Sequence, residues 1–210
     1  MNVGEAVRPR LVVGLGNPGA DYDGTRHNVG FEVVDRVAAR FGADWRRKWR
    51  FAARVTEAAL PSGDKVVLAK PLTYMNGSGK AVAPLMKWWK ISPAELLVVM
   101  DDVDLPLGGV KLRLSGSSGG HRGLASIMES LGGTGEIARL RIGIGRVGVP
   151  GADVTNHVLG RFAPRERELA EQAVATAVDA VVCSVVKGWT AAMNEFNRKM
   201  KNPAAGSEVP

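Results

Sequence analysis

The stretch Leu11–Gly30, LVVGLGNPGADYDGTRHNVG, contains the features that decide the fold and indicate a site. Its apolar start predicts a short buried strand over residues 10–14, which leads into a glycine-rich turn. A polar loop follows and ends in TRHN (residues 25–28), where Asn28 is expected to cap a helix whose apolar residues follow helical spacing. His27 is one of three histidines in the chain. Because loops on a rigid scaffold commonly carry functional side chains, His27 is a candidate catalytic residue.

Strand-like and helix-like segments alternate along the rest of the chain. Apolar or alternating runs predict further strands at residues 51–60, 65–70, 96–100, 110–114 and 139–145. Helical spacing predicts helices at residues 29–41, 78–90, 124–131, 164–187 and 189–199. This alternation is typical of the α/β class, so we expect a single-domain three-layer sandwich with a twisted, mixed, mostly parallel sheet and helices on both faces. The domain should span residues 1–200, and residues 201–210 should form a frayed tail.

The charge of the chain favours an anionic partner. Lys and Arg number 28 against 21 Asp and Glu, a net charge of +7, which suits nucleic acid although many basic proteins bind none. The single cysteine, Cys183, excludes an intrachain disulfide and is expected to be a small buried apolar residue. The sequence has no uninterrupted apolar run of membrane-spanning length, and its first ten residues lack the apolar core of a signal peptide. These features predict a cytoplasmic protein with no membrane partner.

Four polar residues with complementary chemistry follow predicted strands. Asn17 and His27 come after the first strand, Asn76 follows the strand at residues 65–70, and Asp101 follows the apolar run that ends at Met100. In open α/β sheets, ligands bind outside the carboxyl ends of the strands. An imidazole oriented by a carboxylate can take a proton from water, and amides can donate hydrogen bonds to a developing oxyanion. Together these residues can hydrolyse an activated ester without a side-chain nucleophile.

Two glycine motifs suggest other chemistry. Residues 14–19, GLGNPG, fit the dinucleotide pattern G-x-G-x-x-G, but there the helix opens within the glycines, whereas a polar segment intervenes here. Residues 116–120, GSSGG, fit the serine-esterase pattern G-x-S-x-G, and Asp153 and His157 follow in a suitable order. The preceding strand alternates charged with apolar residues, unlike the fully buried strand that carries such a nucleophile. Ser118 therefore remains an alternative nucleophile, and no nucleotide cofactor is expected.

Two further polar segments leave their roles open. Asp101, Asp102 and Asp104 could bind Mg²⁺, but the spacing is unspecific and the basic surroundings argue against a carboxylate cage, so no metal is expected. Residues 45–50, WRRKWR, interleave cations with tryptophans. Such a segment either contacts a phosphate backbone or forms a solvated linker with its tryptophans turned inward.

The combination of these segments resembles the bacterial-type peptidyl-tRNA hydrolase family. In chain order, the matching segments are GLGNPGADYDGTRHNVGF, KPLTYMNGSGKAV, DDVDLPLGGVKLRLSGSSGGHRGL, RLRIGIGR and HVLGRF, which lie between Leu11 and Phe162. The resemblance implies a cytoplasmic, usually monomeric enzyme that works without a cofactor. It also implies a substrate, the ester that joins a peptide to the 3′-terminal ribose of tRNA, whose hydrolysis releases free tRNA and peptide during translation.

The resemblance implies a role for three residues at the reacting bond. His27 matches the catalytic histidine of the family, which acts as a general base on water. Asp101 matches the carboxylate that supports this histidine. Asn17 matches an asparagine implicated in telling N-blocked from free aminoacyl-tRNA.

Five more residues match positions that contact the substrate in the family. Tyr22, Tyr74 and Asn76 match positions that line the channel for the peptide and the 3′ end of the tRNA. Arg113 and Arg141 match a basic pair that holds the tRNA 5′-phosphate. Two strand-borne cations near a glycine loop agree with such a phosphate clamp.

One position departs from the family pattern. Arg122 stands where the family has asparagine in its GGHNG segment, and that asparagine is implicated in binding substrate and ordering water. Arginine cannot accept a hydrogen bond, so Arg122 either supplies a phosphate or carbonyl contact instead or lowers the activity. We expect retained activity, with His121 ordering its loop. The alternative is a non-catalytic, RNA-binding relative that uses the same basic cleft.

Overall fold

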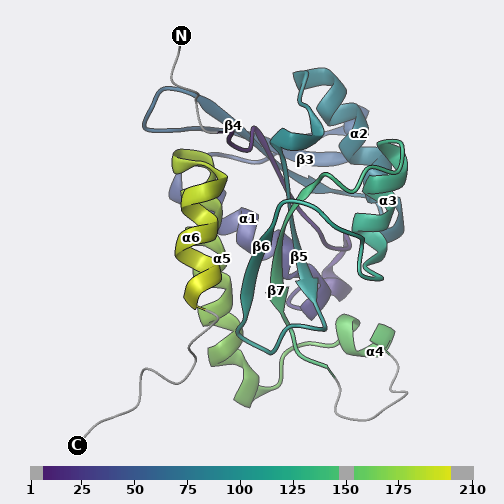
Figure 1. Ribbon diagram of the computed structural model, residues 1–210. Coiled ribbons are helices and arrows are strands. Elements are labelled where there is room, and N and C mark those ends of the chain that lie inside the picture. The colour runs from purple at the N-terminus through teal and green to yellow at the C-terminus, as the bar shows by residue number, and fades with distance from the viewer. Residues whose placement is uncertain (1–6, 147–153, 200–210) are drawn as a thin grey trace, which may run out of the picture.

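The computed structural model describes residues 7–146 and 154–199, which build one seven-stranded sheet with helices on both faces (Figure 1). The strands are β1 (Leu11–Gly14), β2 (Arg46–Lys48), β3 (Ala53–Ala59), β4 (Lys65–Pro71), β5 (Leu96–Asp102), β6 (Val110–Arg113) and β7 (Ala138–Gly143). The α-helices are α1 (Val29–Arg40), α2 (Ser78–Trp89), α3 (Arg122–Ser130), α4 (Val154–Leu159), α5 (Arg167–Lys187) and α6 (Trp189–Lys199). The predicted tail, residues 201–210, lies outside the described residues.

The sheet is mixed, as predicted, with its parallel pairing confined to the centre. The strand order is β2-β3-β4-β1-β5-β7-β6. The strands β4, β1, β5 and β7 pair in parallel, so their carboxyl ends lie at one edge. The outer pairings β2–β3, β3–β4 and β6–β7 are antiparallel. Strands β1 and β5 at the centre are buried at every residue, which explains their apolar runs.

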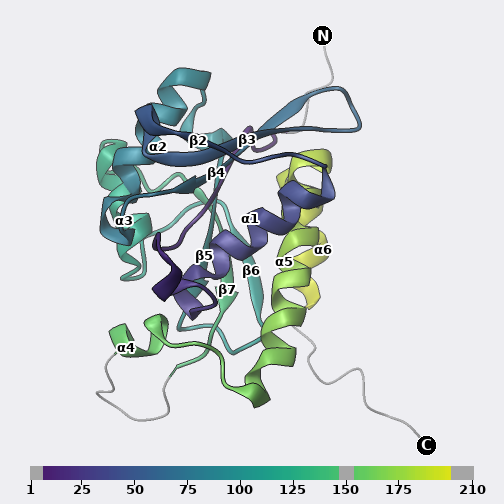
Figure 2. The same ribbon diagram turned by 180° about the vertical axis from the view of Figure 1, so that it is seen from behind.

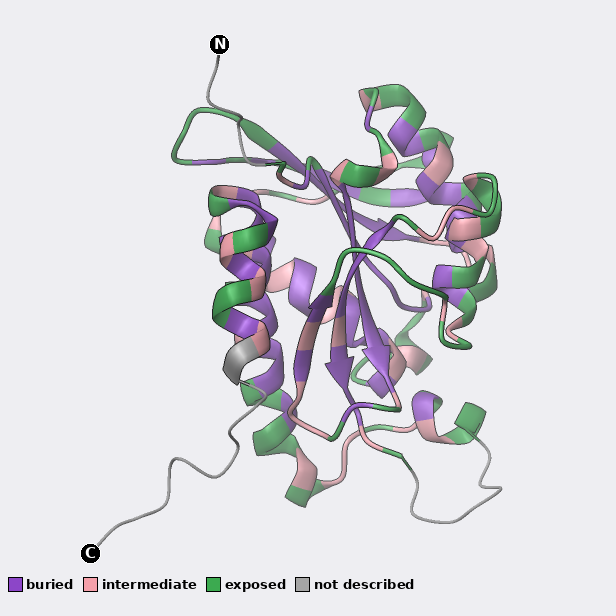
Figure 3. Ribbon diagram, viewed as in Figure 1, coloured by how far each residue is buried: buried purple, intermediate pink, exposed green. Residues whose placement is uncertain are grey.

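The sheet lies between two apolar cores, one on each face (Figures 2 and 3). Helices α1, α5 and α6 pack on one face and contribute most of the first core. Helices α2 and α3 pack on the other face over the second core. The stretch Pro164–Lys187 is long and apolar enough to cross a membrane by length and composition, yet 56% of its most apolar window is buried inside the fold. Its apolar character is therefore explained by packing on the sheet, and Cys183 is buried there as expected.

Glycines bring the start of α1 against the backbone of two strands. A Cβ atom on Gly30 would overlap the carbonyl oxygen of Val99 in β5 and would lie 2.6 Å from the backbone nitrogen and oxygen of Leu15. A Cβ atom on Gly14 would overlap the carbonyl oxygen of Gly30. Gly14 of the GLGNPG motif and Gly30 thus serve close helix–strand packing. This contact fixes the turn that precedes α1 above the end of β5.

Replacing Gly30 with alanine should destabilise the protein by about 3 kcal/mol or more, because strand backbone must move to make room. Gly42→Ala is a matched control, since Gly42 has a φ of 61° but nothing within 4 Å of an added Cβ. It should cost only about 1–2 kcal/mol of backbone strain. Urea unfolding of both variants measures the difference. Equal free energies of unfolding for the two variants would contradict the close approach.

Two elements differ from the sequence-based expectation. Residues 46–48 form the edge strand β2 rather than a linker, because they pair with residues 53–55 in an antiparallel register. Residues 154–159 form the short helix α4, which has too few residues for its apolar spacing to be recognised in the sequence. The Gly/Pro-rich composition of residues 147–153 predicts a loop able to move, and this segment lies outside the described residues.

Candidate active site

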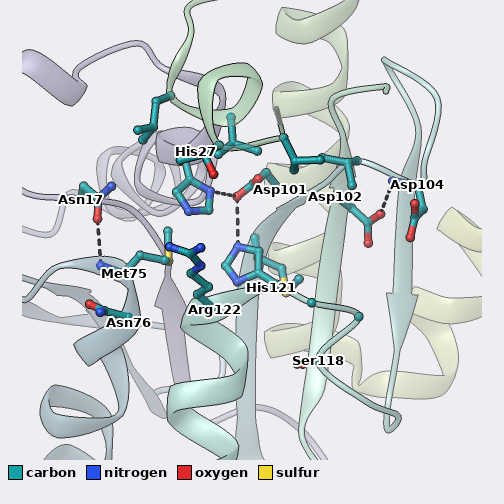
Figure 4. A pocket seen from close by; sticks show the side chains of 18 of the residues that line it. Asn17, His27, Met75, Asn76, Asp101, Asp102, Asp104, Ser118, His121 and Arg122 are labelled. Atoms are coloured by element: carbon teal, nitrogen blue, oxygen red, sulfur yellow. Dashed lines mark hydrogen bonds and ion pairs between the residues drawn. The ribbon is translucent and has the colours of Figure 1, made fainter. Parts of the chain in front are cut away.

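Polar residues from strand ends meet around a cavity of about 690 Å³ at the carboxyl ends of the parallel strands (Figure 4). Asn17, His27, Asn76 and Asp101 all line this cavity, as the sequence predicted. The start of α3 and one side of α4 complete its wall. The fold therefore brings these four polar residues together although they lie up to 84 positions apart in the chain.

His27 lies in the 3₁₀ turn Arg26–Asn28, and the side chain of Arg26 anchors that turn. The buried guanidinium of Arg26 donates to the carbonyl oxygen of Arg161 at 2.8 Å and pairs with Glu166 at 2.7 Å. The backbone nitrogen of Arg26 also bonds to the carbonyl oxygen of Gly160 at 3.0 Å. These contacts tie the turn to the segment that enters α5. The imidazole of His27 is consequently held in one place, with 12% of its side chain exposed.

Asp101 lies near the end of β5, and one of its carboxylate oxygens accepts hydrogen bonds from two imidazoles. His27 Nδ1 lies 2.8 Å from Asp101 Oδ1, and His121 Nε2 lies 3.1 Å from the same atom (Figure 4). Burial alone would raise the pKa of Asp101. The electrostatic attraction of His121 and the hydrogen bonds from both imidazoles outweigh burial and hold this pKa well below its usual range. Asp101 is therefore a buried carboxylate that stays ionised.

Hydrogen bonds to the start of α3 and to Asp101 determine which nitrogen of each imidazole carries a proton. His121 is the N-cap of α3, and its Nδ1 accepts hydrogen bonds from the backbone nitrogens of Gly123 and Leu124. Since Nδ1 is an acceptor, the proton of neutral His121 lies on Nε2, which donates to Asp101. A carboxylate only accepts, so His27 Nδ1 also donates to Asp101. This leaves the lone pair of His27 Nε2 free to accept a proton, as a general base requires.

The same hydrogen bonds bear on metal binding. His27, Asp101 and His121 offer ligand atoms within 4.8 Å of one another. A metal on His121 Nε2 would need the lone pair of that nitrogen, which would move the proton to Nδ1 and remove the cap of α3. The donor set therefore fits a hydrogen-bonded cluster better than a metal site. The other predicted acids, Asp102 and Asp104, are each paired with an arginine, Arg141 and Arg146.

Asn17 is oriented on the wall of the cavity by three hydrogen bonds, one to Met75 and two to Asn28. Its Oδ1 accepts a hydrogen bond from the backbone nitrogen of Met75 at 2.8 Å. The side chain of Asn28 accepts from the backbone nitrogen of Asn17 at 2.8 Å and donates to its carbonyl oxygen at 3.0 Å. Asn28 thus holds Asn17 in place and makes no side-chain cap on α1, which corrects the expectation from sequence. With Oδ1 occupied, the amide Nδ2 of Asn17 is the group left to donate to a ligand.

The residues expected to form a substrate channel lie beside this centre. Tyr74, Asn76 and Arg122 line the cavity, and Arg122 projects between Met75 and the two imidazoles (Figure 4). Tyr22 is absent from the cavity lining among the described residues, but its ring packs edge-on against Tyr74 at 6.3 Å between centroids. Tyr22 therefore packs against Tyr74, which lines the cavity, and does not line it itself.

The predicted phosphate clamp lies on the β6–β7 edge of the sheet, outside the cavity. Arg113 is exposed and stands opposite Arg139, while Arg141 stands opposite Lys111. The guanidinium of Arg141 is bound to the carboxylate of Asp102, so its charge is partly compensated. Arg113 and Lys111 form no ion pair among the described residues. The free positive charge of this edge therefore comes mainly from Arg113 and Lys111.

The serine-esterase interpretation finds no support in the geometry. Ser118 lines the cavity, but the described part of the chain shows no hydrogen bond between its hydroxyl and a histidine or carboxylate. The Nε2 atom of His157 instead bonds to the carbonyl oxygen of Gly145 at 2.8 Å. Asp153, the expected third member, lies outside the described residues. No imidazole is therefore placed to activate Ser118.

Comparisons with known proteins identify the family to which the chain belongs. The sequence model of the family described as Peptidyl-tRNA hydrolase matches residues 11–204. The chain belongs to the peptidyl-tRNA hydrolase family. The peptidyl-tRNA hydrolase of Desulforamulus reducens is 48% identical over 190 residues, which cover 90% of this chain and 89% of the relative. That of Trichodesmium erythraeum is 42% identical over 206 residues, which cover 95% and 94% of the two chains.

Solved structures of the peptidyl-tRNA hydrolase family share the fold. The crystal structure of peptidyl-tRNA hydrolase from Acinetobacter baumannii superposes with a TM-score of 0.85 at 36% identity, covering 92% of this chain and 97% of that one. The single-domain α/β fold and the membership of a family of hydrolases, both predicted from the sequence segments, are confirmed.

Sequence reasoning missed two contributions to this site. It gave His121 only a loop-ordering role, although His121 also donates to Asp101. The scarcity of histidine, with three in 210 residues, was the available signal. It also missed the wall formed by α4, where Val154, Val158 and Leu159 line the cavity. No pattern in so short a helix indicates that it lies across from β5.

Proposed function

We propose that the protein hydrolyses the ester bond of peptidyl-tRNA and releases free tRNA and peptide during translation. The observation that carries this proposal is the Asp101 carboxylate holding His27 with its Nε2 open to the cavity. His27 Nε2 takes a proton from a water molecule while the water oxygen attacks the ester carbonyl carbon. Asp101 stabilises the imidazolium that forms, because the carboxylate is buried and ionised. The imidazolium then returns the proton to the leaving 3′-oxygen of the ribose.

Amides on the cavity wall supply the complementary hydrogen bonds. Asn17 Nδ2 is placed to donate to the substrate, because its Oδ1 is held by the backbone of Met75. Asn76 lies on the same wall and offers a second amide. We assign to these side chains the recognition of the peptide end and the stabilisation of the developing oxyanion. Arg122, which cannot accept a hydrogen bond, contacts a carbonyl or phosphate of the substrate.

The experiment that tests this function is hydrolysis of N-acetylated aminoacyl-tRNA by the wild-type protein. Release of the acetylated amino acid, with much slower hydrolysis of the free aminoacyl-tRNA, is the expected result. A protein that binds the tRNA but hydrolyses neither would favour the RNA-binding alternative. A Ser118→Ala variant should keep its activity within a few-fold of wild type, and loss of activity would favour the serine esterase.

The acid limb of the pH–rate profile should report a single proton. Asp101 stays ionised because its pKa lies well below its usual range, so its carboxylate should not add a second proton to this limb. As the pH falls, log kcat/KM should therefore fall with a slope of about 1. Initial rates with N-acetylated aminoacyl-tRNA across the range in which the protein is folded measure this slope. A slope of 2 would show that the Asp101 carboxylate or another group of the site also takes up a proton in this range.

The β6–β7 edge is proposed to hold the acceptor stem and its 5′-phosphate. Arg113→Ala and Arg141→Ala should raise KM, with a smaller effect on kcat, and Arg113→Ala should have the larger effect because Arg141 is already paired with Asp102. Each lost phosphate contact should reduce the slope of log KM against log salt by about 1. Kinetics at several salt concentrations measure this slope. Unchanged salt dependence in the double variant would place the phosphate elsewhere.

We further propose that the protein acts as a cytoplasmic monomer that needs neither a metal nor another cofactor. The hydrogen-bonded state of both imidazoles supports metal-independent chemistry. Light scattering at working concentration tests the monomer. Activity retained after exhaustive dialysis against a chelator tests metal independence.

A further inference from the structure

A second concave surface lies at the opposite edge of the sheet from Arg113 and Arg141. It consists of β2, the 3₁₀ turn Trp49–Phe51 that follows, and the end of α2, and Figure 2 shows β2 at this outer edge. Its cavity of about 730 Å³ is separate from the active site. We call it the β2-edge surface and define it by Arg46, Arg47, Lys48, Trp49, Arg50 and Trp88.

Two tryptophans of the β2-edge surface are exposed and stack with arginines. Trp49 is 75% exposed and Trp88 is 55% exposed. The guanidinium of Arg47 lies 3.5 Å from the ring centroid of Trp49, and that of Arg50 lies 4.3 Å from the centroid of Trp88. The ring of the buried Phe51 packs beside that of Trp88, with 6.0 Å between the ring centroids, and thereby anchors the turn in the core. Each tryptophan ring therefore has one face against an arginine and is otherwise largely exposed, on a turn that Phe51 anchors.

The charge of the β2-edge surface is positive and largely uncompensated. Five cations line its cavity against two acids, and one of these acids, Glu57, pairs with Lys65 at 3.8 Å. Among the described residues, no ion pair involves any cation of the surface as defined above. Arg47 also stands directly opposite Arg54 in the β2–β3 register, and such like-charge pairs are destabilising. A bound anion would relieve this repulsion.

Protection of an exposed edge strand explains only part of this composition. Charged residues on an edge strand prevent pairing with other chains. That role requires no exposed tryptophan, and large exposed aromatic side chains favour unwanted association. Cations interleaved with accessible aromatic faces are instead the composition with which proteins bind single-stranded nucleic acid, where phosphates meet the cations and bases stack on the rings.

We propose that the β2-edge surface binds single-stranded RNA, with bases stacked on Trp49 and Trp88 and phosphates bound by Arg46, Arg47, Lys48 and Arg50. This RNA is not the acceptor stem of the substrate. Five strand spacings, about 24 Å, separate β2 from β7, so the β2-edge surface is distinct from the residues proposed to hold the stem. The inference does not rest on the proposed esterase activity, because RNA binding at this surface involves no ester.

Fluorescence anisotropy with a labelled oligouridylate of about 12 nucleotides tests the proposal on the full chain. The wild type should bind with salt-dependent affinity, and binding should quench tryptophan fluorescence. Trp49→Ala/Trp88→Ala should weaken binding by about tenfold or more, and Arg47→Ala/Arg50→Ala should weaken it and flatten its salt dependence. A matched charge control is Arg165→Ala/Arg167→Ala, which removes two exposed arginines outside both basic surfaces and should bind like wild type.

Three further measurements separate the proposal from its competitors. Saturating deacylated tRNA should leave the oligouridylate bound, and its displacement would overturn the claim of a separate site. Hydrolysis of N-acetylated aminoacyl-tRNA should be unchanged in Trp49→Ala/Trp88→Ala and in Arg47→Ala/Arg50→Ala. Unchanged hydrolysis would also show that both variants fold. Wild-type protein that fails to bind the oligonucleotide, or variants that bind it as wild type does, would overturn the proposal. Tryptophan-dependent binding to phosphatidylglycerol vesicles without RNA binding would do the same.

Discussion

Replacing His27 with alanine should lower kcat/KM for N-acetylated aminoacyl-tRNA by a factor of at least about 10². The variant loses the only imidazole nitrogen of the described site that is held with a free lone pair towards the cavity, since His121 uses both of its ring nitrogens. KM should change little, because His27 is assigned to the chemical step rather than to tRNA binding.

Steady-state kinetics of His27→Ala beside Ser118→Ala and the wild type measure this loss. Both substituted residues line the same cavity, so the serine variant controls for a general disturbance of the site. A His27→Ala variant with activity within a few-fold of wild type would contradict the mechanism. Equal losses in both variants would point to disturbed structure rather than to a lost base.

The second large effect is expected for Asp101→Asn. Asparagine is nearly the same size and can still accept from both imidazoles, but it removes the charge that stabilises the His27 imidazolium. Its amide can also donate to His27 Nδ1, which would place the imidazole proton on Nε2, where it blocks the base. We therefore expect kcat to fall by a factor on the order of 10²–10⁴, with KM little changed.

His121→Asn provides the matched control for Asp101→Asn. Asparagine is a good N-cap, so α3 should remain, while the donor from His121 to Asp101 is lost. Because His27 keeps its own bond to Asp101, the loss in kcat should be about tenfold, the equivalent of one hydrogen bond to a charged group. Steady-state kinetics of the two variants, with urea unfolding to confirm folding, give the comparison. A larger loss in His121→Asn than in Asp101→Asn would show that His121, rather than Asp101, supports the base.

The sequence predicted the elements whose pattern is local. Buried strands such as β5 appear as apolar runs, and α1 follows helical spacing up to the glycine at position 42. The common edge of the parallel strands then placed His27 and Asp101 together, although they lie 74 positions apart. The roles of Arg113 and Arg141 came only from the resemblance to the family, and their assignment to the 5′-phosphate remains a prediction.

What the sequence did not predict depends on contacts between distant segments. Asn28 has the residue type of a helix cap, yet its side chain binds the backbone of Asn17 because the turn after β1 lies directly beside it. The pairing of Arg141 with Asp102 follows from the adjacency of β5 and β7, which are 36 or more positions apart. Strand β2 has no apolar alternation, since all three of its residues are exposed. Only its register with β3 makes it a strand.

A single-turnover experiment with enzyme in excess over N-acetylated aminoacyl-tRNA tests the central claim most directly, because it separates the chemical step from tRNA binding. At saturating enzyme, His27→Asn should hydrolyse the bound ester at least about 10²-fold more slowly than wild type, while the enzyme concentration for half-saturation stays the same. A His27→Asn variant that hydrolyses the bound ester at the wild-type rate would contradict the assignment of His27 as the base that activates water.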